Sequence, residues 1–455
     1  MKKKRIYAIL EIKERELLAK TLFAIEMAKS GHSVVIGKKS SLYRYQKYFQ
    51  SGIFYFKGMG KKNVEPMQEI KKNGHKIVGF DEEGLVVNQV SGIADRVNKN
   101  CLNMVDFFFT VGAKQQKNTL KVYPDFKKKI YEIGNPRFDL LKKKNNKFYR
   151  NEIQALKKKY GKFVFFATNF TMLNNYFFSS NQIMKKPSVK NNLHIFERDL
   201  ENQKRIKKKL LYFFNYFPKK YPNINIVIKP HPVERKDYWI KLLKKIKCKN
   251  LMLADQKFNT NSYLLASEFN VGSNCHTSLE SYLCEKPTIN IRANKKDNIQ
   301  ISKLIRTVSG KEVLHMKELE KIISDWFNKN KKFRNELSKR EKSILYHNVK
   351  NIKQESSFFF EKIISTINIQ PKIKKDKYSN FFYLKFFSYL RKIKNLYYSF
   401  RSTKDELDFF QAKFPGLKLD EFRFYVKEFS NVLNYDFKKL SVKEIYPGCF
   451  CLEKL

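Results

Sequence analysis

The stretch that decides the fold runs from residue 225 to residue 237 and reads Asn-Ile-Val-Ile-Lys-Pro-His-Pro-Val-Glu-Arg-Lys-Asp. Its largely β-branched beginning is typical of a buried strand. Pro230 and Pro232 have no N–H to donate to a sheet, so the strand must end at His231. Open α/β folds bind ligands at the carboxyl edge of a parallel sheet. We therefore expect His231 to meet an anionic group there; the alternative is a loop histidine in a rigid turn.

A second stretch places acids after a predicted strand. Residues 76–84 read Lys-Ile-Val-Gly-Phe-Asp-Glu-Glu-Gly, so the strand leads directly into Asp81, Glu82 and Glu83. Adjacent carboxylates repel one another, and at least one of the three is expected to have a raised pKa, as a general base near neutral pH needs. The alternative is a solvated acidic turn or a helix N-terminus, where acids are favoured.

A third stretch, residues 268–280, predicts a strand, a Gly-Ser turn and a helix, and reads Glu-Phe-Asn-Val-Gly-Ser-Asn-Cys-His-Thr-Ser-Leu-Glu. Hydroxyl groups and free N–H groups at a helix start form a phosphate site; the alternative is ordinary N-capping by Ser273 or Asn274. The residues expected to bind a donor substrate are Lys229, Ser273, Asn274, Thr277, Ser278 and Glu280, with Thr168 and Asn169 from the turn after another predicted strand.

Together these motifs resemble the acidic D/E-D/E-G, the His-Pro and the Ser/Thr motifs of bacterial sialyltransferases and polysialyltransferases, and they occur in the same order. Over roughly residues 1–365 the chain is also similar to bacterial surface carbohydrate biosynthesis proteins. The segments that carry this similarity are Glu11-Ile-Lys-Glu-Arg-Glu16, Asp81-Glu-Glu-Gly84, Gly134-Asn-Pro-Arg-Phe-Asp-Leu-Leu141, Lys229-Pro-His-Pro232 and Lys286-Pro287. No single motif is specific, but five occur in order.

The resemblance implies an inverting transfer of a nonulosonic-type acidic sugar from a CMP-activated donor to a glycan or lipid-linked acceptor, with no metal or other cofactor. Matching the acidic motif makes Glu82 the base, although the extra acid Asp81 leaves the register open by one residue. His231, together with Ser273, Thr277 and the helix amides, would stabilise the departing phosphate. Glu280 would accept from a ribose hydroxyl or, alternatively, face solvent.

Two other functions fit parts of the sequence. A polyol-phosphate transferase of the teichoic-acid type also has Lys-x-His-Pro and a Ser-rich helix start, and it would use CDP-glycerol. A basic nucleic-acid-binding protein would account for 93 Lys and Arg against 43 Asp and Glu. The sequence has no RNA-binding aromatic motif and no helix-turn-helix signature, so we expect no nucleic-acid partner.

The length of 455 residues suits two domains and an appendage. Alternating strands and helices predict Rossmann-like domains at residues 1–150 and 151–345. With the resemblance, this gives an α/β, GT-B-like fold with two facing domains and a deep cleft. The expected strands are residues 5–10, 33–36, 53–56, 76–80, 107–111, 129–134, 162–167, 225–228, 266–271 and 288–291, with another near 251, and the expected helices are residues 15–30, 197–217, 235–245 and 277–283.

The end of the chain is expected to differ from these domains. Residues 346–370 predict a crossover helix, and residues 371–455 a basic, aromatic, helical extension. The aromatic and basic residues of 371–400 suit an interfacial helix on an anionic membrane; packing of this stretch onto the second domain is the alternative. Because the extension lies beyond every motif, we expect it to be dispensable for the chemistry.

The cysteines and the distribution of apolar residues indicate the cellular compartment in which we expect the protein. The six cysteines form no C-x-x-C pair, which indicates reduced thiols. The basic start, Lys2-Lys-Lys-Arg5, is followed by apolar residues only as far as Leu10, too few for an export signal. No segment approaches the ~20 apolar residues that span a bilayer. We expect a cytoplasmic protein, free or peripheral on the inner face of the membrane.

Overall fold

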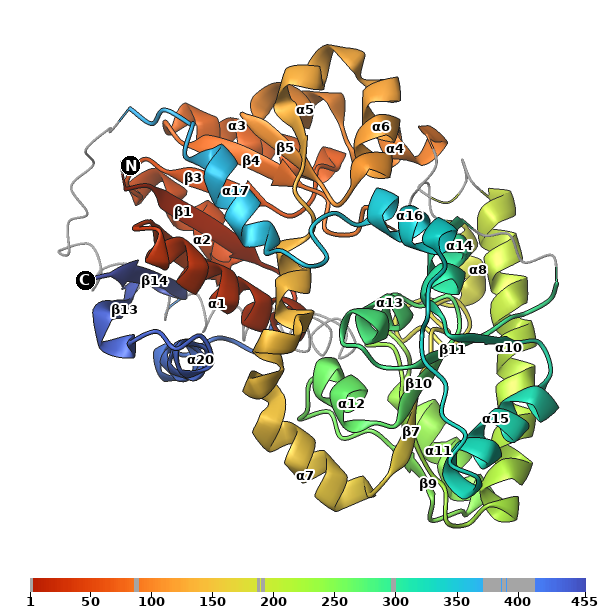
Figure 1. The fold of residues 1–455 in the computed structure, drawn as a ribbon. Helices are drawn as coiled ribbons and strands as arrows, with labels where there is room; N and C mark the ends of the chain where they lie inside the picture. The colour runs from red at the N-terminus through yellow and green to blue at the C-terminus, as the bar shows by residue number, and fades with distance from the viewer. Residues whose placement is uncertain are drawn as a thin grey trace. The chain divides into compact units, whose positions relative to one another are not determined.

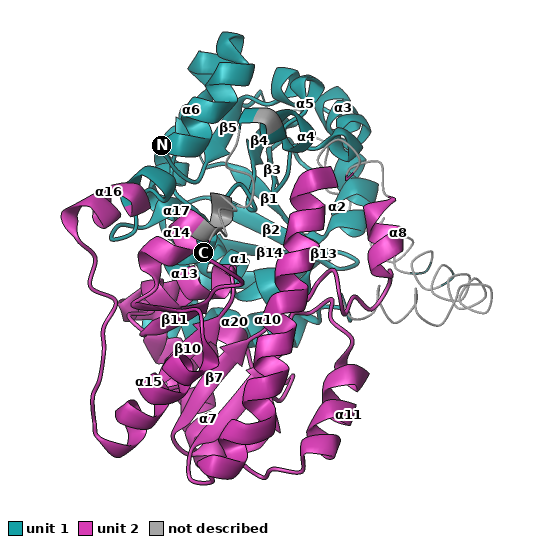
Figure 2. Cartoon of the chain, turned by 90° about the vertical axis from the view of Figure 1, so that its right-hand side faces the viewer, with its two compact units in different colours: residues 1–140, 346–455 teal, residues 141–345 magenta. Residues whose placement is uncertain are grey.

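The computed structural model describes residues 3–85, 90–185, 189, 193–295, 300–370, 386, 390 and 414–455. The chain divides into two compact units, shown in Figure 2: unit 1 contains residues 1–140 and 346–455, and unit 2 contains residues 141–345. Each unit has its own sheet with helices packed on it (Figure 1). Both units are Rossmann-like, which confirms the predicted α/β, GT-B-like fold class.

Unit 1 holds, within the described residues, an eight-stranded sheet in the order β13-β14-β2-β1-β3-β4-β5-β6. The six neighbouring strands from β2 to β6 in this order are parallel. The chain continues from β1 to β2 on one side and then to β3 on the other side, so the topological switch point lies between β1 and β3. The strands are β1 (Arg5–Leu10), β2 (Ser33–Lys38), β3 (Ile53–Phe56), β4 (Lys76–Phe80), β5 (Phe107–Thr110), β6 (Ile130–Glu132), β13 (Leu440–Tyr446) and β14 (Cys449–Lys454).

Helices cover this sheet. They are α1 (Lys13–Lys29), α2 (Lys39–Tyr45), α3 (Val64–Lys72), α4 (Ile93–Arg96), α5 (Lys99–Met104), α6 (Ala113–Val122), α17 (Ser356–Ile364) and α20 (Leu419–Val432), while α16 (Lys339–Asn348) spans the boundary between the units. The predicted crossover helix is α17. Asp139 accepts hydrogen bonds from the backbone N–H groups of Ser356 and Ser357 at its start, at 2.8 and 2.9 Å. A carboxylate is favoured at a helix N-terminus, so Asp139 fixes α17 to unit 1.

The last 42 described residues, 414–455, belong to the sheet of unit 1. β14 pairs antiparallel with β2, and β13 pairs antiparallel with β14. α20 packs against α1, where Lys13 and Glu421 form a 2.7 Å ion pair. The expected helical extension is therefore only partly helical, because it also contains a hairpin that the sequence did not predict. The stretch expected to lie on a membrane, residues 371–400, falls outside the described residues except for Phe386 and Leu390.

Unit 2 holds a parallel sheet of six described strands in the order β12-β11-β10-β7-β8-β9. This is the strand order of a dinucleotide-binding fold, and its switch point lies between β7 and β10. The strands are β7 (Phe163–Ala167), β8 (Asn225–Lys229), β9 (Leu251–Leu253), β10 (Phe269–Gly272), β11 (Thr288–Ile291) and β12 (Lys311–Val313). The helices are α7 (Arg150–Tyr160), α8 (Ser180–Met184), α10 (Leu193–Lys220), α11 (Lys236–Ile246), α12 (Thr260–Ala266), α13 (His276–Leu283), α14 (Gln300–Val308) and α15 (Met316–Asn328).

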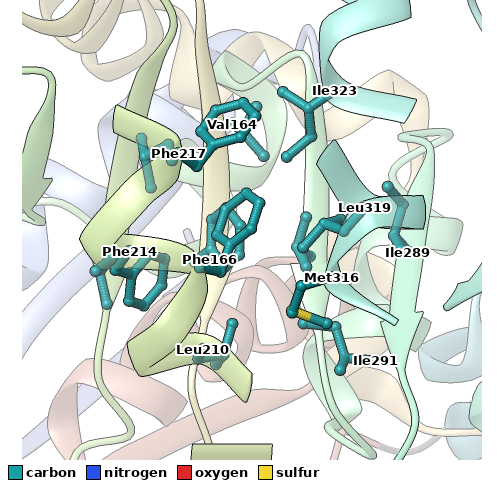
Figure 3. Close-up of a cluster of buried hydrophobic side chains, with 14 of the residues drawn as sticks. Val164, Phe166, Leu210, Phe214, Phe217, Ile289, Ile291, Met316, Leu319 and Ile323 are labelled. Atoms are coloured by element: carbon teal, nitrogen blue, oxygen red, sulfur yellow. The ribbon is translucent and has the colours of Figure 1, made fainter. Parts of the chain in front are cut away.

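One face of this sheet forms an apolar core with α10 and α15 (Figure 3). Alternate residues of the strands, such as Val164 and Phe166, point into it, as the period of two in a strand requires. Phe214 and Phe217 come from α10, and Leu319 from α15. This packing fixes the strand ends from which the polar loops of unit 2 emerge.

None of the helices formed by the described residues is both long enough and apolar enough to cross a membrane.

Candidate functional site

The switch point of unit 2 carries a depression of about 460 Å³, a volume that includes the solvent at its mouth, and its lining is both polar and apolar. Thr168 and Asn169 reach it from the end of β7, and Ser273 and Asn274 from the end of β10. Its floor is apolar, and one wall comes from α10, which contributes Asp199, Asn202 and Gln203. Open α/β sheets bind ligands at this point of the topology. The structure thus brings together four of the eight residues expected to bind a donor, and α10 adds three polar residues that the sequence analysis missed.

The turn from β10 into α13 is held by its own backbone geometry. Asn274 has a φ of 45°, in the left-handed region that asparagine tolerates, and its N–H donates to Asn290 Oδ1 at 3.1 Å. A Cβ on Gly272 would lie 3.3 Å from Ser278 Oγ, so α13 lies close against the strand. This close approach directs Ser278 toward the sheet, where it is fully buried.

The other four residues expected to bind a donor, Lys229, Thr277, Ser278 and Glu280, lie outside the set that lines the depression. Thr277 Oγ1 is 3.1 Å from Cys275 Sγ at the start of α13. Glu280 is buried, with 8% of its surface exposed, so the alternative of a solvent-facing glutamate is wrong. Lys229 directs its ammonium to the carbonyl of Phe258, at 2.9 Å. The donor-binding roles assigned to these four residues stay predictions.

Buried Glu234 joins the loop after β7, which lines the depression, to the segment after β8. Its Oε1 accepts from Thr168 Oγ1 at 2.8 Å, from Phe170 N at 3.0 Å and from His231 N at 3.2 Å. Its Oε2 accepts from Trp239 Nε1 at 3.0 Å and from Asn174 Nδ2 at 3.5 Å. Only 2% of Glu234 is exposed, so these donors replace the water that a carboxylate would otherwise hold. Glu234 directly follows the Lys-Pro-His-Pro-Val segment, but the sequence analysis gave it no role.

His231 lies two residues after the end of β8 at Lys229, whereas the strand was expected to reach His231, and it is half-buried; it is not among the residues that line the depression. The N–H of Val233 donates to its Nδ1 at 3.3 Å. Because Nδ1 accepts this bond, the neutral ring carries its proton on Nε2. His231 is therefore arranged as a hydrogen-bond donor through Nε2, which suits contact with an anionic oxygen.

The three adjacent acids of unit 1 do not face one another. Arg96 donates to both oxygens of Asp81, with one bond of 2.9 Å, and Asp81 is almost fully buried. Glu83 is half exposed and pairs with Arg15 at 3.1 Å. Glu82 pairs with Lys20 at 2.8 Å, and both side chains are nearly buried, at 11% and 6% exposure.

These ion pairs overturn the expected pKa pattern for both glutamates. Burial by itself raises the pKa of Glu82, but the ammonium groups of Lys20 and Lys57 outweigh it and hold that pKa below its ordinary value. Burial likewise raises the pKa of Glu83, and Arg15 and Arg96 outweigh it. The expectation of a raised pKa was wrong for both residues because cations from other elements, Lys20 and Lys57 for Glu82 and Arg15 and Arg96 for Glu83, lie close to these carboxylates.

A depression in unit 1 distinguishes Glu82 from the other two acids. It has about 260 Å³ of open space and is lined by Glu16, Ala19, Lys20, Phe23, Tyr55, Glu82, Pro136 and Arg137. Lys20 lies over the ring of Tyr55, 3.8 Å from its centroid. Burial, with a further contribution from Glu82, raises the pKa of Tyr55 well above its ordinary range, so its phenol stays protonated. The sequence analysis missed Lys20 and Tyr55; for Arg137 the available signal was the Gly-Asn-Pro-Arg-Phe-Asp segment.

In the described part of the chain, no group of three or more His, Cys, Asp or Glu side chains could hold a metal ion.

No family model matches the sequence, and no curated protein matches it. Solved structures do match. A putative UDP-N-acetylglucosamine 2-epimerase from Listeria monocytogenes is 10% identical with a TM-score of 0.50, over 82% of this chain and 100% of that one. Anabaena HepE, solved with UDP and glucose, is 11% identical with a TM-score of 0.46, over 80% and 100%. Methanocaldococcus jannaschii UDP-GlcNAc 2-epimerase, solved with UDP-GlcNAc and UDP, is 13% identical with a TM-score of 0.46, over 79% and 99%. Identities this low make the likeness one of fold alone.

Proposed function

We propose that this protein is a sugar-nucleotide-dependent glycosyltransferase of surface polysaccharide biosynthesis that transfers a nonulosonic-type acidic sugar from a CMP-linked donor. The observation that carries the proposal is the depression at the switch point of unit 2, lined in part by Thr168, Asn169, Ser273 and Asn274. The putative UDP-N-acetylglucosamine 2-epimerase from Listeria monocytogenes has a similar fold, which supports a nucleotide-sugar partner. The three motifs favour CMP as the nucleotide.

In the proposed reaction the acceptor oxygen bonds to the anomeric carbon as the bond from that carbon to the phosphate oxygen breaks. CMP leaves with the electron pair, and the acceptor proton passes to Glu82. The lowered pKa keeps Glu82 ionised at neutral pH and able to accept this proton, although it makes the carboxylate a weaker base. His231 would donate from Nε2 to the departing phosphate, and the loop hydroxyls and amides would add further donors. No step requires a metal.

The acceptor is proposed to be a glycan or a lipid-linked glycan, modified in the cytoplasm at the inner face of the membrane. The depression around Glu82 supports an acceptor site in unit 1, because of the three adjacent acids only Glu82 is among the residues that line it. This observation also favours Glu82 over Asp81 as the base, which the sequence alone left open by one residue.

Nucleotide release from purified protein tests the donor assignment. CMP-, CDP- and UDP-linked donors are offered one at a time, with and without a glycan acceptor. We expect acceptor-dependent release of CMP. Turnover of CDP-glycerol alone would favour the polyol-phosphate transferase, and turnover of a UDP-sugar alone would overturn the donor assignment.

Two substitutions separate the base from a structural acid. Glu82→Gln is expected to lower turnover by about 10²–10⁴-fold, with donor affinity nearly unchanged. Asp81→Asn is the matched control, because it also removes a carboxylate from a buried ion pair but lies outside the depression. His231→Ala should lower both donor affinity and turnover. Equal losses of turnover in the two acid variants, with unchanged folding, would contradict the assignment of Glu82.

A further inference from the structure

The outer face of α11 carries an unusual density of uncompensated charge. Within 14 residues, 236–249, six lysines are exposed: Lys236, Lys241, Lys244, Lys245, Lys247 and Lys249. None of them forms an ion pair with another residue in the described ranges of the chain. The one acid of this segment, Asp237, already pairs with Arg235 at 3.4 Å. The six lysines and Ile240 are called the α11 surface below.

This charge has an internal energetic disadvantage. Within α11, Lys241 is three residues before Lys244 and four before Lys245. Side chains at these spacings are neighbours on a helix, and like charges there destabilise it. Lysines in the last turn do interact favourably with the helix dipole, but that effect falls off within one turn and does not reach Lys236 or Lys241. An external anion would remove the repulsion along the whole segment.

The helix is placed where it can meet a large partner. It covers β9, the edge strand of the unit 2 sheet, and its inner side contributes buried Trp239 and Ile246 to the core. Figure 2 shows α11 at the margin of unit 2. Among the lysines lies Ile240, 46% exposed, with no share in that core. A large aliphatic side chain within a basic helical face is typical of a helix that lies at a lipid interface.

We infer that the α11 surface docks unit 2 on an anionic phospholipid bilayer, with the lysines at the headgroups and Ile240 at the acyl boundary. Lysine ammonium groups attract anionic lipid through the surface potential, and each residue close to the membrane changes binding by roughly fivefold. A nucleic-acid partner is less suited to this surface, because single-strand binding depends on exposed aromatic rings and no exposed ring accompanies these lysines within the segment. The inference is independent of the donor and of the proposed reaction.

Vesicle binding by the full-length protein tests the inference. Sedimentation is measured with vesicles of phosphatidylcholine alone and with equal parts phosphatidylcholine and phosphatidylglycerol. The test variant replaces Lys241, Lys244 and Lys245 by glutamine, which preserves helix propensity. The matched control replaces three exposed lysines of unit 1, Lys71, Lys72 and Lys121, by glutamine and so makes the same change in net charge.

We expect the wild type and the control to bind anionic vesicles and the test variant to bind roughly 100-fold more weakly, from fivefold per lysine. The single variant Ile240→Asn keeps every charge. It should weaken vesicle binding more at high salt than at low salt, because the apolar contact dominates when the charges are screened. Equal weakening by the test variant and the control would show only a general charge effect and overturn the inference. Binding that is unaffected by Ile240→Asn and is abolished by competing tRNA would assign the surface to nucleic acid and also overturn it.

Discussion

Replacing Glu234 by glutamine tests whether one buried carboxylate holds the loops of the unit 2 site. The amide can present its oxygen to Thr168, Phe170 and His231, but its NH₂ group then faces the Trp239 N–H, whose present acceptor is 3.0 Å away. The flipped amide is worse, since it opposes three donors. A buried donor without an acceptor costs about 1–3 kcal/mol, and each bond that passes from a charged to a neutral acceptor loses roughly 1 kcal/mol.

The sum predicts that Glu234→Gln lowers the free energy of unfolding of unit 2 by about 4–6 kcal/mol, a large part of the ~5–15 kcal/mol typical of a domain. Both tryptophans of the chain, Trp239 and Trp326, lie in unit 2, so denaturant unfolding followed by tryptophan fluorescence reports on this unit. Glu201→Gln, on the exposed face of α10 in the same unit, is the control, and we expect it to change stability by less than about 0.5 kcal/mol.

A double variant makes the test specific. In the double variant Glu234→Gln/Trp239→Phe the phenyl ring presents no N–H to the amide. Its loss in free energy of unfolding should therefore be smaller, by about 1–2 kcal/mol, than the sum of the losses in the two single variants. Trp326 still reports on unfolding. Strict additivity, or a loss below about 1 kcal/mol in Glu234→Gln, would refute the reasoning, because the carboxylate would then not be the acceptor that these donors need.

Two further predictions concern unit 1. Truncation after residue 370 removes β13, β14 and α20, including the buried side chains of Phe422, Phe450 and Leu452, each worth about 1.5–3 kcal/mol. We expect unit 1 to lose its unfolding transition by circular dichroism while the tryptophan signal of unit 2 persists; this differs from the expectation, based on the sequence, that the extension is dispensable for the chemistry. An unchanged unit 1 would contradict the sheet topology. Burial lowers the pKa of His32 despite its hydrogen bond to Glu361. The unfolded state therefore binds a proton at this histidine more tightly than the folded state does. The stability of unit 1 should fall as the pH drops below 6.5, the ordinary pKa of histidine. His32→Gln should remove that dependence, as measured by melting temperature above and below this pH, whereas an identical pH slope in the variant would assign the effect to another group.

The parts of the fold that the sequence predicted are those set by local patterns. The strands at residues 53–56 and 288–291 were predicted with the limits they have, and β8 ends at Lys229, directly before Pro230. Short β-branched or aromatic segments with Pro or Gly at their ends have one favourable local structure, so tertiary context changes little. The strand expected at 266–271 begins only at Phe269, because residues 260–266 form α12. The turns after β7 and β10 were placed correctly for the same local reason.

Long-range pairing could not be read in the same way. The hairpin at the end of the chain pairs with β2, and the register joins Phe450 to Ile36 across more than four hundred residues. Its strands alternate weakly, and no short-range signal says which sheet edge they will cover. The Arg96 partner of Asp81 and the Lys20 partner of Glu82 are also contributed by separate helices. Reasoning from three adjacent acids therefore predicted repulsion where the fold supplies separate cations.

The two depressions are stabilised by different interactions: hydrogen bonds in unit 2 and a buried ion pair in unit 1. For this reason we expect substitutions in the two depressions to have different effects on folding. In unit 2 the loop after β7 is held by the Glu234 carboxylate together with backbone hydrogen bonds, and the β10 turn by Asn290, so we expect that side chains such as Ser273 can change without loss of the fold. In unit 1 Lys20 and Glu82 are both nearly buried, and removing either leaves an uncompensated charge that costs about 3–5 kcal/mol. Loss of activity on substituting Glu82 thus contains a folding contribution that loss at Ser273 does not. Asp81→Asn, which removes a buried carboxylate from an ion pair outside the depression, separates the two contributions in part, because its partner Arg96 is 24% exposed and also pairs with Glu83, whereas Lys20 is only 6% exposed.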